Sequence, residues 1–184
     1  MIEQPESPKD KALREVGRAV VNFQRLEHNL KVAARLGPIG GPLSNALRDV
    51  EKRAEKSMSW TLGQAIQAWT TTLGSDHEPQ GYTPDLFEPT VSLRFGLVEA
   101  KESRESNAET LKGLLEFRNK LIHGGLVHFP WDSPQDCAQL VRDIAEVIPI
   151  IGAQIDFIAA VLQTLQGIAE EDIEFYEGSE PREI

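Results

Sequence analysis

The sequence is poor in the residues from which metal, redox and nucleophilic sites are usually built. Cys137 is the only cysteine among 184 residues. An intrachain disulfide is therefore excluded, which fits a reducing compartment. The four histidines show none of the i,i+4 pairing around a carboxylate that marks a helical metal site. Glycine-rich phosphate loops, Gly-x-Ser-x-Gly elbows and cysteine clusters are also missing, so we expect no bound metal and no cofactor.

Positive charge is scarce as well. The chain has 29 Asp and Glu against 19 Lys and Arg, which gives a net charge of −10 and a pI of about 4.9. Residues 170–184 hold seven acids against Arg182, a balance of −6, so the remaining 169 residues carry −4. A broad basic face that holds duplex nucleic acid by its phosphates is therefore not expected. A small site that acts on a flexible single strand is compatible with this charge.

The chain also lacks the hydrophobic runs of a targeted or membrane protein. Residues 1–8 have no basic start and no apolar stretch, so no secretory signal is expected. The most apolar segment, residues 147–169, is interrupted by Pro149, Gln154 and Asp156. We interpret it as a core or interface helix and not as a membrane span. These features predict a cytoplasmic protein without a membrane partner.

Hydrophobic spacing predicts helices over most of the chain. Ser7 and Pro8 can cap and start a helix that runs to residue 36. Its apolar stripe has alternating spacings of four and three residues, which is typical of a helix in a bundle. The stripe consists of Ala12, Val16, Ala19, Phe23, Leu26, Leu30 and Ala33.

A second long helix is expected from Pro134 onwards, and it is apolar over more than one face. Such a helix lies centrally or at a subunit interface. The sequence therefore predicts an all-α, antiparallel helical bundle with long first and last helices. Residues 1–8 form a flexible N-terminus, 9–168 a single domain, and 169–184 an acidic tail that we expect to be disordered.

The middle of the chain predicts shorter elements. Residues 37–42 read as a turn-rich connector, and 43–56 and 60–72 as amphipathic helices. Residues 73–89 are expected to form a long loop. Residues 91–95 alternate weakly and favour a short strand, although no partner strand is evident.

The most unusual residue is Arg118, in a helix predicted over residues 105–123. On a helical projection, Leu111, Leu114, Leu115, Leu121 and Ile122 lie within roughly 60° of it. Arg118 is therefore expected to be buried, which requires an anionic or polar partner. His123 closes the helix, and Gly124-Gly125 can supply the left-handed residue that ends it.

Glu27 is the acid that we expect Arg118 to meet. It lies at the edge of the apolar stripe of the first helix, close in projection to Val20, Phe23 and Leu30. If the two helices pack, Glu27 can pair with the arginine. The alternative is an ordinary i,i+4 pair between Glu27 and Lys31.

Two segments together resemble the HEPN superfamily (higher eukaryotes and prokaryotes nucleotide-binding). The first is LLEFRNKLIHG, residues 114–124, which contains Arg118 followed by four residues and His123, with Asn119 directly after the arginine. The second is VVNFQRLE, residues 20–27, in the long first helix. The resemblance covers residues 13–165 in architecture, but only Arg118, Asn119 and His123 in motif.

The resemblance implies an all-α, metal-independent endoribonuclease, of a kind found in toxin–antitoxin pairs and in phage defence. It also implies a homodimer, an RNA substrate and a possible antitoxin or other partner protein. Many HEPN-like proteins are non-catalytic helical modules. The alternative is therefore a scaffold that binds a protein partner or a nucleotide, in which Arg118 ties helices together and His123 caps a helix C-terminus.

The residue types suit RNA cleavage. A histidine titrates near neutrality, so His123 can act as general base or acid. Arg118 offers a planar fork of donors to phosphate oxygens, Asn119 can hold a phosphate or orient His123, and Glu27 would fix the arginine. On a regular α-helix, however, residues five apart differ by about 140°. The two side chains converge only if the helix unwinds at its glycine end, or if two subunits share a cleft.

Two aromatic residues follow the motif. Phe129 and Trp131 can stack an unpaired base. The alternative is that they cover an edge of the hydrophobic core.

Overall fold

The computed structural model describes residues 6–36, 39–72, 90–93 and 100–178. The chain is mostly helical, as predicted. Its main helices are α1 (Pro8–Ala33), α2 (Leu43–Met58), α3 (Leu62–Thr72), α4 (Lys101–Asn119) and α5 (Pro134–Gly178). Ala34–Leu36 extend α1 as a short 3-10 turn, η1, and a π-helix, η2 (Lys120–Gly125), follows α4.

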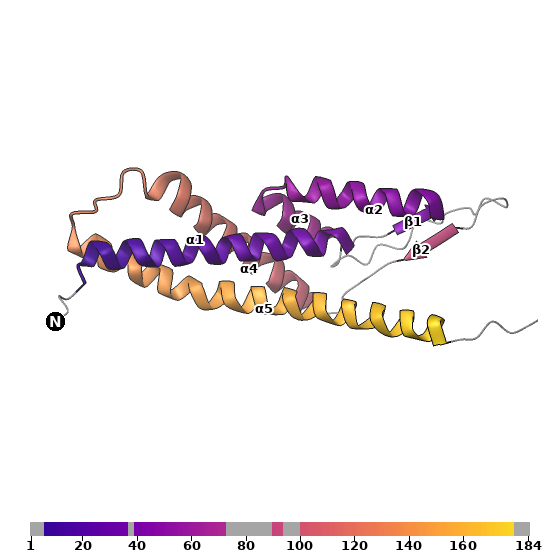
Figure 1. The fold of residues 1–184 in the computed structure, drawn as a ribbon. Helices are drawn as coiled ribbons and strands as arrows, with labels where there is room; N and C mark the ends of the chain where they lie inside the picture. Colours follow the sequence, from indigo (N-terminus) through magenta and orange to yellow (C-terminus); the bar gives the residue numbers. More distant parts are fainter. Residues whose placement is uncertain (1–5, 37–38, 73–89, 94–99, 179–184) are drawn as a thin grey trace, which may run out of the picture.

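The helices form a bundle in which α5 packs along the length of α1 (Figure 1). In this view α1 and α5 run in the same direction and α4 runs in the opposite one. The shorter α3 packs between α1 and α4. The first and last helices are the longest, with 26 and 45 residues.

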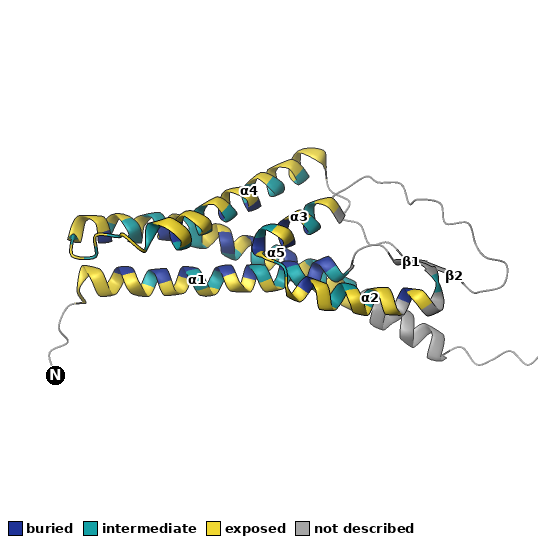
Figure 2. Cartoon of the chain, turned by 90° about the horizontal axis from the view of Figure 1, so that it is seen from above, coloured by how far each residue is buried: buried dark blue, intermediate teal, exposed yellow. Residues whose placement is uncertain are grey.

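The predicted N-terminal cap and apolar stripe of α1 are confirmed. The Ser7 hydroxyl accepts a hydrogen bond from the backbone N–H of Asp10, at 3.1 Å, and satisfies one of the free donors of the first turn. All seven residues of the predicted stripe are buried. Figure 2 shows the buried positions of α1 as bands along the side that faces the other helices, while the outer side of α4 is exposed.

Two hydrophobic clusters lie along the bundle. The larger one joins α1, α3, α4 and α5 around buried residues that include Leu26, Leu30, Leu62, Leu111 and Ile151. The smaller one lies at the end where α4 turns towards α5, and it joins Val16 and Ala19 of α1 to Leu121 and Ile144. This second cluster fixes the position of the π-helix.

The connector predicted over residues 37–42 contains a strand, which corrects that prediction. Strand β1 (Ile39–Pro42) pairs in antiparallel register with β2 (Thr90–Leu93), with Ile39 opposite Leu93. The strand expected near residues 91–95 is thus present over 90–93. Its partner is β1, whose glycine and proline residues had been interpreted as turn residues. The loop predicted over residues 73–89 lies outside the described residues.

The other boundary corrections concern α4 and α5. Helix α4 begins at Lys101, four residues earlier than predicted, and its α-helical part ends at Asn119. Helix α5 continues to Gly178, through most of the tail that we expected to be disordered. Residues 168–177 contain no glycine or proline and include good helix formers, so extending an existing helix costs little.

Helix α5 is apolar enough to be considered as a membrane span. By length and composition alone, the segment Pro134–Gly167 could cross a bilayer, and 22% of its most apolar window is buried inside the bundle. A core helix of a soluble protein passes the same test, so the feature is weak evidence for a membrane span.

Candidate functional site

The structure brings Arg118, Asn119 and His123 together at the end of α4. The Nη1 atom of Arg118 donates to Oδ1 of Asn119, at 3.1 Å, and lies 3.2 Å from Nε2 of His123. On a regular α-helix the arginine and the histidine would point in different directions. The π-helix Lys120–Gly125 removes this difference, because its i→i+5 hydrogen bonds place residues five apart about one turn apart. The first of the two expected geometries, a helix unwound at its glycine end, is therefore the one observed.

Gly125 permits the wide turn. A Cβ atom built on Gly125 would lie 2.9 Å from the backbone oxygen of Lys120, whereas one built on Gly124 would meet nothing within 4 Å. Neither glycine has a backbone in the left-handed region, so the prediction of a left-handed helix end is wrong. Gly125 is needed here because a carbonyl approaches it closely, and not because of an unusual φ angle.

Leu121 anchors the π-helix to the bundle. Its side chain is buried, and it packs in the smaller cluster with Val16, Ala19 and Ile144. With the inner side of the turn held by α1 and α5, the polar side chains lie at the surface. Asn119 and His123 are exposed and Arg118 is half-buried.

The prediction that Arg118 is buried is therefore wrong. Leu111, Leu114 and Leu121 occupy the buried positions of this stripe, while the guanidinium reaches surface partners. A long side chain can cover apolar neighbours with its methylenes and keep its charge near water. Such a placement avoids the desolvation cost of a buried cation and leaves the guanidinium open to an incoming anion.

Glu27 does not pair with Arg118. Its carboxylate forms an ion pair with Lys31, at 2.7 Å, which is the i,i+4 alternative that the sequence offered. Lys31 also donates to the backbone oxygen of Met58, at 3.3 Å. Among the described residues no ion pair joins Glu27 to Arg118. The local partner prevails because Lys31 lies one turn away on the same helix and reaches Glu27 without any need for a second helix to supply the cation.

The Arg118 guanidinium can only donate hydrogen bonds. Its 3.2 Å contact with His123 is a hydrogen bond where Nε2 acts as the acceptor, which requires the tautomer with the proton on Nδ1. A fork of donors beside a basic ring nitrogen matches an oxyanion that lies next to a hydroxyl group.

Phe129 and Trp131 follow the site in the connection to α5. Their ring centroids are 4.7 Å apart at an interplanar angle of 59°, and both residues are half-buried. Trp131 also packs against the smaller cluster. This arrangement fits the alternative in which the two rings cover an edge of the core.

An apolar pocket of about 230 Å³ separates the π-helix from the first turns of α5. Its lining combines hydrophobic and polar residues: Phe117, Lys120, Leu121, Gly125, Leu126, Phe129, Asp136, Gln139, Leu140 and Asp143. Across the part of the chain that the structure describes, no group of three or more His, Cys, Asp or Glu side chains is placed to hold a metal ion. The pair Arg118–His123 thus remains the most clearly organised polar feature of this end of the bundle.

No protein-family model, characterised protein or solved structure matches the chain. The fold and the site define an all-α bundle with an Arg–Asn–His cluster where α4 continues into a π-helix. Its activity has to be inferred from the chemistry of those side chains.

Proposed function

We propose that the protein is a metal-independent endoribonuclease of the HEPN type, with Arg118, Asn119 and His123 at its catalytic site. The observation that supports this most directly is the 3.2 Å contact between Arg118 and His123. A π-helix is rare and is often found at functional sites. Here it brings a guanidinium, which can bind phosphate, next to an imidazole, which can act as a general base.

The proposed reaction uses the RNA's own 2′-hydroxyl as the nucleophile. His123 removes the hydroxyl proton through Nε2, and the 2′-oxygen attacks the adjacent phosphorus. Arg118 exchanges its contact with His123 for the non-bridging oxygens, where negative charge grows, and Asn119 orients the arginine. The bond to the 5′-oxygen breaks, and that oxygen takes up the proton that His123 removed, which returns the imidazole to its starting form. The products are a 2′,3′-cyclic phosphate and a 5′-hydroxyl.

The direct test is digestion of a synthetic single-stranded RNA by purified protein in the presence of a chelator. We expect cleavage by the parent, cyclic-phosphate ends, and no cleavage where a 2′-deoxy nucleotide replaces the reacting one. His123→Ala should lower the rate by about 10²–10⁴-fold, and Arg118→Ala by about 10²–10³-fold. Far-UV circular dichroism checks that each variant is folded.

His128→Ala is the matched control, because His128 is an exposed histidine that follows the same π-helix. It should cleave like the parent. Equal losses in His128→Ala and His123→Ala, or no cleavage by the parent, would contradict the proposal. Loss of the parent's activity on chelation would point to a metal-dependent enzyme.

In the cell, we propose a cytoplasmic protein that acts as a toxin–antitoxin or phage-defence component. Growth inhibition on expression, relieved by His123→Ala, is the expected sign of such a role. Growth inhibition that persists with His123→Ala would argue against a role based on RNA cleavage.

The second candidate is a non-catalytic helical scaffold that binds a protein partner or a nucleotide. The exposed apolar surface of α5 favours it, since 22% of the most apolar window of that helix is buried and Ile150 is 44% exposed. The same surface suits a homodimer, which we propose for either function. Light scattering should give the mass of a dimer for the parent and of a monomer for Ile150→Asp. Identical behaviour of the parent and His123→Ala towards RNA, with the dimer intact, would favour the scaffold.

A further inference from the structure

The outer face of α1 carries arginines in a single row. On a helical projection Arg14, Arg18 and Arg25 lie within about 40° of one another, opposite the buried stripe of the helix. They span eleven positions, or roughly 16 Å along the helix axis. Such a row is usually no more than a solvated surface. The residues that surround the row decide whether it can bind a ligand.

The row is a local exception to the charge of the protein. Helix α1 contains six Lys and Arg and three Asp and Glu, so its net charge is 6 − 3 = +3 in a chain of net charge −10. A shallow hollow of about 490 Å³ follows the row, and no acidic residue lines it. Its lining is Arg14, Gly17, Arg18, Val21, Asn22 and Arg25. With Glu6 and Glu15 paired to the row, its own balance is 3 − 2 = +1, so this surface attracts anions weakly although the protein as a whole repels them.

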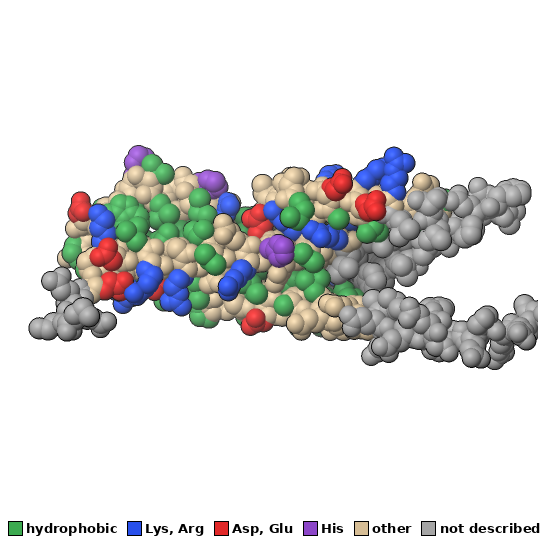
Figure 3. Space-filling model, viewed as in Figure 1, with side chains coloured by type: hydrophobic (Ala, Val, Ile, Leu, Met, Phe, Trp, Pro, Cys, Tyr) green, Lys and Arg blue, Asp and Glu red, His purple; other side chains and the backbone are tan. Residues whose placement is uncertain are grey.

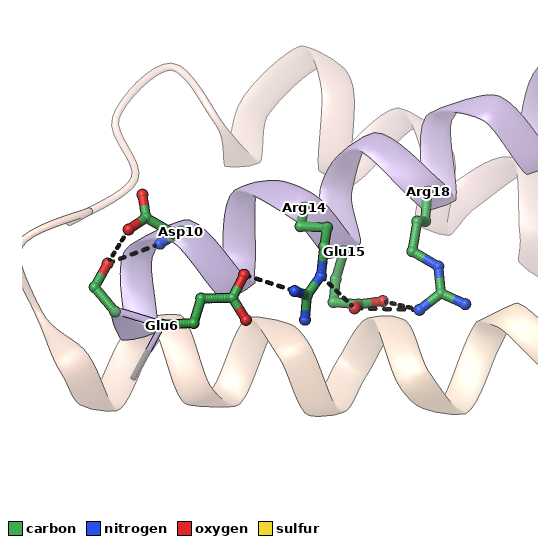
Figure 4. Close-up of polar contacts among 6 residues, drawn as sticks. Glu6, Asp10, Arg14, Glu15 and Arg18 are labelled. Carbon is green, nitrogen blue, oxygen red and sulfur yellow. Dashed lines mark hydrogen bonds and ion pairs between the residues drawn. The ribbon is translucent and has the colours of Figure 1, made fainter. Parts of the chain in front are cut away.

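Two of the arginines are held in place by carboxylates (Figure 4). Arg14 pairs with Glu6 at 2.7 Å and with Glu15 at 3.6 Å, and Arg18 pairs with Glu15 at 3.1 Å. The Glu15 side chain is only 14% exposed, so it supports both guanidinium groups from below the surface. Among the described ion pairs none involves Arg25, whose charge is thus the least compensated of the three.

The row and the candidate site lie on different sides of α1, because the π-helix contacts the buried stripe of that helix and the arginines lie opposite it. Figure 3 shows Lys and Arg side chains over α1, and His side chains over the segment after α4, in the same view. The two elements are joined by the smaller cluster, in which Val16 and Ala19 of α1 contact Leu121 of the π-helix. A flexible strand that lies along the outer face of α1 would have to pass around this helix to reach Arg118 and His123.

We propose that the outer face of α1, formed by Arg14, Arg18 and Arg25, binds the phosphodiester backbone of single-stranded RNA. This inference rests on the proposed ribonuclease activity, since it names a surface that holds the RNA at a distance from the reacting phosphate. A single row on an acidic protein is too narrow to neutralise both strands of a duplex, whereas a flexible strand can follow it. Arginine suits the task because its fork binds phosphate oxygens in pairs.

The test measures binding apart from cleavage. A short, fluorescein-labelled 2′-O-methyl oligonucleotide has no free 2′-hydroxyl, so the proposed reaction cannot occur, and fluorescence anisotropy reports affinity alone. Arg25→Gln should weaken binding about fivefold, as expected for one exposed charge contact. It should also reduce the slope of log affinity against log salt by about 0.7, the value for one contact to a single strand.

Two further variants sharpen the result. Arg142→Gln removes an exposed arginine from α5 and should leave the affinity unchanged. Glu15→Gln removes the carboxylate that competes for Arg14 and Arg18, so it should tighten binding. The same oligonucleotide annealed to its complement should bind more weakly than the single strand.

The inference would be overturned by equal affinities for Arg25→Gln and Arg142→Gln, by an unchanged salt slope, or by tighter binding of the duplex. Failure of the ribonuclease proposal looks different. In that case the 2′-O-methyl strand binds through the α1 arginines, but unmodified RNA is not cut. If unmodified RNA is cut while the arginine variants bind and cleave like the parent, the α1 inference fails alone.

Discussion

The two glycines that end η2 allow the link between backbone shape and site geometry to be tested. In Gly125→Ala the new methyl group would lie 2.9 Å from the backbone oxygen of Lys120 and 3.7 Å from its carbonyl carbon. A backbone carbonyl cannot rotate away as a flexible side chain can, so the turn has to open. Such overpacking costs about 1–3 kcal/mol.

Gly124→Ala supplies the reference for this measurement. Its methyl group would meet nothing within 4 Å, so the variant gains about 0.4–1 kcal/mol because the unfolded chain loses conformational freedom. The same entropic gain applies to Gly125→Ala and cancels in the comparison. The difference between the two free energies of unfolding therefore isolates the steric cost of about 1–3 kcal/mol. Urea unfolding gives this difference, and each kcal/mol should appear as roughly 2–4 °C in melting temperature.

Cleavage of RNA by the same two variants tests the site itself. Opening the turn at Gly125 moves His123 relative to Arg118, and a displacement near 1 Å can lower a rate by about 10²-fold. Gly124→Ala should retain the parent's rate. If the two variants unfold with equal free energies, or if Gly125→Ala cleaves at the rate of Gly124→Ala, the turn does not control the site as described.

Four other substitutions test the packing and the local contacts. Glu27→Gln should lower the free energy of unfolding by no more than about 1 kcal/mol and leave RNA cleavage unchanged, because its partner is Lys31; a large loss of cleavage in the folded variant would restore its link to the site. Leu26→Ala, at a fully buried position, should cost about 2–5 kcal/mol, whereas Val21→Ala, at a position 48% exposed, should change stability by less than about 0.5 kcal/mol; similar values for both would contradict the assignment of the core. Ser7→Ala should cost about 1 kcal/mol in urea unfolding through loss of the cap on α1, and a neutral result would mean that water replaces the hydroxyl.

Periodicity was a good guide to the faces that are buried. The stripe of α1 was predicted residue by residue, because a spacing of four and three in a helix has only one way to face a core. The cap at Ser7 and the start of α5 at Pro134 follow from equally local chemistry. Strand β1 was missed because glycine and proline usually mark turns, and its pairing depends on a segment some fifty positions further along the chain.

The candidate site was predicted in its members but not in its shape. Arg118 contacts both Asn119 and His123, yet no residue pattern indicates an i→i+5 turn in advance. The adjacent glycines were the available signal, and they were interpreted as a left-handed helix end. The predictions that Arg118 is buried and that it pairs with Glu27 were wrong for the same reason. A helical projection gives the direction of the Cα–Cβ bond, whereas the charged group of a long side chain lies several bonds further out.

The arginine row on α1 was also missed, although its signal was present. The net charge of the whole chain does not reveal a positively charged face on one helix. The acidic tail lowers that net charge further and makes such a face still harder to detect. The i,i+4 spacing of Arg14 and Arg18, with Arg25 on the same face, could have been found by projecting the polar residues of the first helix as carefully as the apolar ones.

The thiol of Cys137 can report local opening at the end of the bundle that holds the π-helix. It is fully buried in the first turn of α5, and its Sγ lies 3.4 Å from the backbone oxygen of Trp131. A thiol reagent can reach it only when the packing around it opens, so the labelling rate under native conditions measures how often this region opens. A single natural atom thus serves as a reporter of local breathing beside the π-helix, without any engineered label.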